Sequence, residues 1–81
     1  MQRRKTLREV RGEYSRKAAY AERGSVKQVV YAAIYREMLQ WNNKQDAKSG
    51  LDFLRAAAPQ EDKHYYQEAI DALTSRGEER G

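Results

Sequence analysis

The chain has 81 residues, no cysteine and a formal net charge of +4 at pH 7. This length allows a single domain, residues 1–81, with one modest core. The lack of cysteine excludes disulfides, a thiolate nucleophile and thiolate metal sites. No stretch approaches the roughly twenty apolar residues of a membrane span, and the basic N-terminus lacks the apolar run of a secretory signal. We therefore expect a cytoplasmic protein.

The charge is unevenly distributed along the sequence. Residues 1–40 carry ten lysines and arginines against four acidic residues, a net charge of +6. Residues 41–81 carry six against eight, a net charge of −2. A basic half beside a mildly acidic half favours a polyanion, such as nucleic acid, or an acidic protein as the partner.

The first apolar pattern predicts a helix near residues 6–22. Its apolar residues recur at steps of three and four: Leu7, Val10, Tyr14, Ala18 and Ala21. Thr6 and Glu9 have the spacing of a capping box, which would start the helix there. The apolar stripe is narrow, so this helix should lie at the surface of the core. We expect residues 1–4 to be frayed.

The long apolar stretch of residues 25–41 predicts a second, central helix. Its apolar residues surround the helix on nearly all sides, which is typical of a helix covered from several directions. The segment VVYAAIY contains strand-favouring residues, but strict alternation is missing and the stretch is long for a strand. Ser25 and Gln28 have capping-box spacing. The short connection at Gly24 predicts that the first two helices are antiparallel neighbours.

Glu37 lies near the middle of the apolar side of this central helix. In one interpretation, the apolar face rotates near the helix end and Glu37 reaches solvent. In the other, Glu37 is a partly buried carboxylate paired with an arginine. We expect the first.

A third helix is predicted near residues 44–57, after a polar turn. Asn43 can cap its start, and Asp46 at the third position suits the helix dipole. An alternative start at Ser49 would place Gly50 in the first turn instead of the interior. The sequence leaves both starts open.

Pro59 ends the third helix and fits the first turn of a fourth, near residues 60–76. Gly77 is a natural C-cap, and residues 77–81 should form a disordered tail. The predicted fold is an all-α bundle of four helices, or three long and one short, around residues 25–41. The expected core residues are Leu7, Val10, Tyr14, Val26, Val30, Ala33, Ile34, Leu51, Leu54, Tyr66, Ile70 and Leu73.

The sequence offers little catalytic chemistry. His64 is the only histidine and falls on the polar side of its helix, where one exposed imidazole without cysteine cannot form an ordinary zinc site. No pattern marks a nucleophile with its base, and phosphate-binding glycine loops, HExxH and calcium-loop motifs are missing. We therefore expect no enzymatic activity, metal, cofactor or small-molecule substrate.

Basic residues crowd the first predicted helix and its approach: Arg3, Arg4, Lys5, Arg8, Arg11, Arg16 and Lys17. Arg4, Arg8 and Arg11 lie on one stripe, at a spacing that can follow a phosphate backbone. Tyr14 and Tyr20 are interleaved, and tyrosine can stack on unpaired bases, although Tyr14 is expected in the core. We predict a regulator or accessory factor that binds nucleic acid through this helix.

The alternative function is protein binding through the back of the central helix. Ala32, Tyr35 and Leu39 give that side apolar surface. If the small bundle leaves them uncovered, they form a patch of the kind that binds protein. The chain would then be an adaptor, an inhibitor or a homodimeric scaffold.

Overall fold

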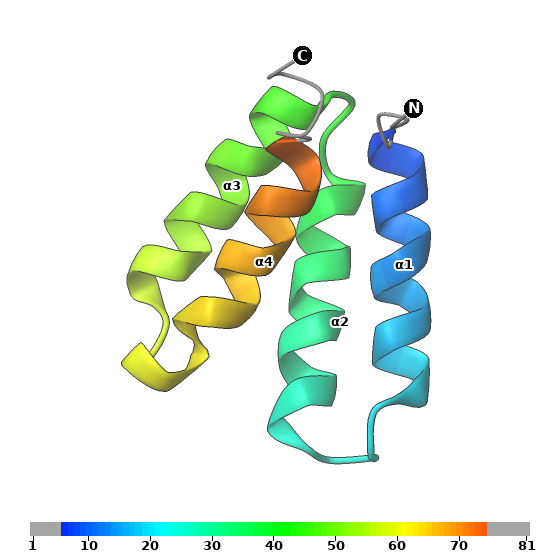
Figure 1. Ribbon diagram of the computed structural model, residues 1–81, viewed down its shortest axis with the longest axis vertical. Coiled ribbons are helices and arrows are strands. Elements are labelled where there is room, and N and C mark those ends of the chain that lie inside the picture. The colour runs from blue at the N-terminus through cyan, green and yellow to red at the C-terminus, as the bar shows by residue number, and fades with distance from the viewer. Residues whose placement is uncertain (1–5, 75–81) are drawn as a thin grey trace.

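The computed structural model describes residues 6–74, and the expectations for residues 1–4 and 77–81 lie outside this range. The described chain is helical and contains no strand, which confirms the all-α prediction (Figure 1). Its elements are α1 (Leu7–Tyr20), α2 (Val26–Leu39), α3 (Lys44–Ala57), the 3₁₀ turn η1 (Gln60–Asp62) and α4 (Lys63–Thr74).

The helices form two hairpins, α1 with α2 and α3 with α4, packed against each other (Figure 1). α2 contacts all three other helices, as expected of the central helix. α4 also contacts the other three, so two helices from different hairpins share the central role. The turn between α1 and α2 extends beyond α3 and α4 at the bottom of Figure 1.

Local capping starts α1 as predicted. The Thr6 hydroxyl accepts a hydrogen bond from the Glu9 amide at 3.1 Å, and the Glu9 carboxylate accepts one from the Thr6 amide at 3.0 Å. This reciprocal pair is the capping box, and it satisfies two amides that the first helical turn leaves without a partner.

The start of α2 is only half as predicted. Ser25 accepts a hydrogen bond from the Gln28 amide at 3.2 Å, but the Gln28 side chain bonds to the Gly24 amide at 2.8 Å. The Ser25 amide is already donated to the Glu22 carbonyl at 3.0 Å, so it cannot complete a capping box. Gly24 has a φ of 80°, the left-handed conformation that glycine adopts without strain.

Asn43 decides where α3 begins. Its side-chain oxygen accepts a hydrogen bond from the Asp46 amide at 2.9 Å, and α3 starts at Lys44. The alternative start at Ser49 is wrong, and Gly50 lies inside the helix. Pro59 follows the end of α3, and the predicted fourth helix opens with η1 before its α-helical part begins at Lys63.

The core lies between the two hairpins and consists of Leu7, Val10, Tyr14, Val30, Ile34, Met38, Ala47, Leu51, Tyr66, Ala69 and Leu73. Of the expected core residues, Ala33, Leu54 and Ile70 are half-buried. The prediction that Val26 belongs to the core is wrong, because this residue is 59% exposed at the first position of α2, beside the protruding turn. Met38 is fully buried and was missing from the expected core.

Both interpretations of Glu37 are wrong in their details. The residue is half-buried, and its carboxylate accepts hydrogen bonds from the Trp41 indole nitrogen at 2.8 Å and from the Gln40 amide nitrogen at 3.3 Å. An indole N–H therefore satisfies this carboxylate where an arginine or water was expected.

Candidate functional site

The predicted basic residues do not act as one stripe. Arg3, Arg4 and Lys5 lie outside the described residues. Arg8, Arg16 and Lys17 are exposed on α1.

Arg11 is engaged within the protein. Its Nε donates a hydrogen bond to the Met38 carbonyl at 3.2 Å, and its Nη2 donates one to the Trp41 carbonyl at 2.8 Å. These carbonyls lie at the C-terminal end of α2, where a cation also complements the helix dipole. Arg11 therefore holds α1 to the end of α2, and its guanidinium is not available to a ligand in the way that was expected.

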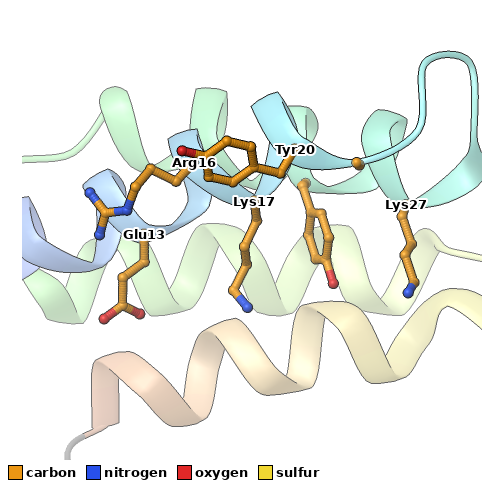
Figure 2. Close-up of a pocket in the computed structure, with 7 residues that line it drawn as sticks. Glu13, Arg16, Lys17, Tyr20 and Lys27 are labelled. Carbon is orange, nitrogen blue, oxygen red and sulfur yellow. The ribbon is translucent and has the colours of Figure 1, made fainter.

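The other basic residues of this hairpin surround an open hollow of about 480 Å³ between α1 and α2. Its lining residues are Glu13, Arg16, Lys17, Tyr20, Ala21, Lys27 and Tyr31. Figure 2 shows the side chains of Glu13, Lys17 and Lys27 pointing to the same side, toward the pale orange helix α4. Arg16 and Tyr20 lie next to each other along α1, one helical turn apart. Three cations against one carboxylate make the hollow positive.

Aromatic rings form one wall of the hollow. The Lys17 ammonium lies 5.7 Å from the centre of the Tyr14 ring and 5.6 Å from that of Tyr31, within cation–π range. Tyr31 packs edge-to-face against Tyr14 at 5.7 Å and against Tyr65 at 5.6 Å. These ring contacts join α1, α2 and α4, and Lys17 lies against two of the three rings.

The phenols in this wall are held in their neutral form. Burial raises the pKa of Tyr14 well above its ordinary value, and the nearby Glu68 carboxylate raises it further. Burial and Glu68 raise the pKa of Tyr31 in the same way. Both phenols therefore stay protonated near neutral pH.

His64 is exposed, as expected, and lies against the Tyr65 ring at a centroid distance of 4.0 Å. Within residues 6–74, no group of three or more histidine, aspartate or glutamate residues is placed to hold a metal ion. None of the helices in that range has the length and hydrophobicity needed to cross a membrane.

Tyr20 is the most exposed large hydrophobic residue of the described chain, with 83% of its surface accessible. It lines the hollow together with Lys27, which our sequence-based list of basic site residues omitted, and Figure 2 shows its ring beside Arg16. The short turn at Gly24 carried the missing signal, because it places the end of the first helix beside the start of the second.

A second open groove, of about 640 Å³, runs between α1 and α2. Its lining residues are Ser15, Ala18, Ala19, Gln28, Val29, Ala32, Tyr35 and Arg36, and we call this surface the outer face. Val29 is 63% exposed there, and Leu39, one turn beyond Tyr35, is 51% exposed. The back of α2 that was singled out from Ala32, Tyr35 and Leu39 is therefore only partly covered by the bundle.

Comparison of the chain with protein families, with curated proteins and with solved structures gave no match.

Proposed function

We propose that this protein is a non-enzymatic regulator or accessory factor that binds single-stranded nucleic acid in the hollow between α1 and α2. The observation that carries the proposal is the Tyr20 ring, which is 83% exposed in a hollow that also contains Arg16 and Lys27. A solvent-exposed ring among cations offers a base a surface to stack on and offers the adjoining phosphates positive charge.

The use of cations elsewhere in the molecule supports this assignment. On the α3–α4 hairpin, Arg55 bonds to Asp52 and Gln67, and Lys63 donates to carbonyls at the end of α3. Those two cations stabilise the fold. Within the described part of the chain, Arg16 and Lys27 make no hydrogen bond or ion pair, so their charges remain available to phosphates.

Ring stacking favours unpaired bases over duplex. A stacked base must expose its flat face, which a base inside a duplex does not do. Phosphate contacts through lysine and arginine carry no sequence information, so we expect binding with little base preference.

The test measures binding of a labelled single-stranded oligonucleotide by fluorescence anisotropy over a range of salt concentrations. Affinity should fall with salt, and Arg16→Gln or Lys27→Gln should each reduce the slope of log affinity against log salt by about 0.7. Tyr20→Ala should weaken binding about 5- to 150-fold, since base stacking contributes about 1–3 kcal/mol per base, and should leave the salt slope unchanged.

Lys48→Gln is the matched control, because it removes the same charge from α3, away from the hollow. It should leave both affinity and slope close to wild type. If the chain shows no affinity for single-stranded DNA or RNA at low salt, the proposed function is wrong. Equal weakening by Lys48→Gln and Lys27→Gln would show that net charge, and not the hollow, drives binding.

A further inference from the structure

The outer face is independent of the nucleic-acid hollow. The two surfaces lie on the same helical hairpin but share no lining residue. The apolar part of the outer face comes from α2, where Val29 is more than half exposed and Ala32 and Tyr35 are half-buried. Apolar surface exposed along a groove is typical of a protein contact.

On α1, the outer face is built from small side chains, which let a facing helix approach closely: Ser15, Ala18 and Ala19. On α1 the charged residues lie at the ends of this face, whereas α2 places one charged residue, Arg36, within it. Arg8 is seven residues before Ser15, which places it on the same stripe of α1, and Glu22 follows the end of the helix, directly after the extended residue Ala21. Both are exposed, and within the described residues neither side chain has a hydrogen-bonding or ionic partner.

This charge pattern makes the face complementary to itself when it is reversed. We propose that the outer face binds a second copy of this chain, with the two α1 helices antiparallel about a twofold axis near Ser15. Arg8 of each copy then faces Glu22 of the other, so the contact contains two equivalent ion pairs, as a closed twofold interface requires. Two helices pack on two helices, the arrangement of a four-helix bundle.

The same twofold axis also brings the apolar residues of the two α2 helices together. Because α1 and α2 are antiparallel, Ala32 lies close to the level of Ser15 along the hairpin. Reversal about that level brings Val29 of one copy toward Tyr35 of the other. Side chains that the monomer leaves in water are therefore buried in the dimer, and the hollow on the other side of the hairpin stays open.

The experiment measures the dimer dissociation constant by sedimentation equilibrium. Arg8→Glu and Glu22→Arg should each weaken dimerisation about 25-fold, because each removes two symmetric ion pairs and a surface pair contributes a factor of about five. An equimolar mixture of the two variants should dimerise like the wild type, since every contact in the mixed dimer joins opposite charges. The double variant Arg8→Glu/Glu22→Arg should also recover.

Controls separate the interface from general effects of charge and folding. Lys48→Glu on α3 changes charge away from the outer face and should leave dimerisation unchanged, whereas Val29→Asp should abolish it. Circular dichroism verifies that each variant is folded. A wild-type chain that is monomeric at about 1 mM, the weak limit of specific association, overturns the proposal. A dimer that ignores both charge reversals, or variants that fail to recover on mixing, also overturn it.

Discussion

Gly50 is a residue whose identity is constrained by a contact with another helix. It lies inside α3, where glycine costs about 1 kcal/mol relative to alanine. A Cβ at this position would overlap the Glu37 carboxylate and come within 2.8 Å of the Trp41 indole nitrogen. These two groups are hydrogen-bonded to each other against the surface of α3, so the absence of a side chain at residue 50 leaves room for the pair.

We predict that Gly50→Ala destabilises the fold by about 1 kcal/mol despite its gain in helix propensity, because the half-buried Glu37–Trp41 hydrogen bond must be displaced. Gly12→Ala on α1 is the matched control. There the nearest heavy atom, Arg16 Nη1, lies 3.7 Å from the new Cβ, so the substitution should stabilise by about 0.5–1 kcal/mol. Urea unfolding measures both, and an equal gain for the two variants would contradict this account.

The sequence identified Glu37 as anomalous but could not supply its partner. A carboxylate on an apolar stripe signals that something compensates it. The choice of Trp41 over an arginine or solvent depends on how closely α3 approaches α2, which is a tertiary property. Gly50 was the clue to that approach, and in sequence it only raised a question about where the third helix begins.

At the scale of the helices, the sequence predicted the contacts that join near neighbours. Thr6, Ser25 and Asn43 cap their helices as expected, because a capping side chain bonds to an amide only three positions away. Arg11 and Lys63 were not predicted in their capping roles. Arg11 reaches carbonyls 27 and 30 residues away, and no local pattern carries information over that separation.

The unpredicted role of Arg11 also explains why the sequence predicted the candidate site only in part. Composition identified the basic hairpin but could not distinguish a cation that binds the end of α2 from one that stays in solvent. In the structure, Arg16 and Lys27 border the hollow and Arg8 lies on the stripe of the outer face. One basic cluster in the sequence thus divides among a structural contact and two separate surfaces.

The extent of burial along α2 was also beyond the sequence. Val26, Val30, Ile34 and Met38 follow one another at steps of four, so they form one stripe, and this stripe was correctly oriented. The sequence did not predict how much of the stripe is buried, because the exposed fraction falls from 59% at Val26 to 0% at Met38. Periodicity determines which side of a helix is apolar, whereas the reach of α3 and α4 determines how much of that side is buried.

At the scale of the whole molecule, three tyrosines connect the hairpins. Tyr31 on α2 packs edge-to-face against Tyr14 on α1 and against Tyr65 on α4. Tyr14 is only 3% exposed, and its burial raises the pKa of the phenol above the ordinary value. The folded chain therefore keeps this phenol protonated at a pH where the unfolded chain ionises it, and global stability becomes sensitive to alkaline pH.

The sign of that dependence follows from proton counting. Below about pH 10, the ordinary pKa of tyrosine, both states hold the Tyr14 proton and the free energy of unfolding is unaffected. Above that pH the unfolded chain releases the proton while the folded chain retains it. The free energy of unfolding should then fall by up to about 1.4 kcal/mol per pH unit until the raised folded-state pKa is reached.

Urea unfolding of wild type and Tyr14→Phe between about pH 8 and pH 11, a range that spans the ordinary tyrosine pKa, isolates this contribution. The decline with pH should be shallower in Tyr14→Phe, because its buried ring has no proton to lose. Tyr20→Phe, which removes a phenol from the surface, is the control for the loss of a tyrosine hydroxyl. Parallel profiles for Tyr14→Phe and wild type would mean that Tyr14 is ionised with equal ease in both states, and hence that its phenol is not buried in the folded chain.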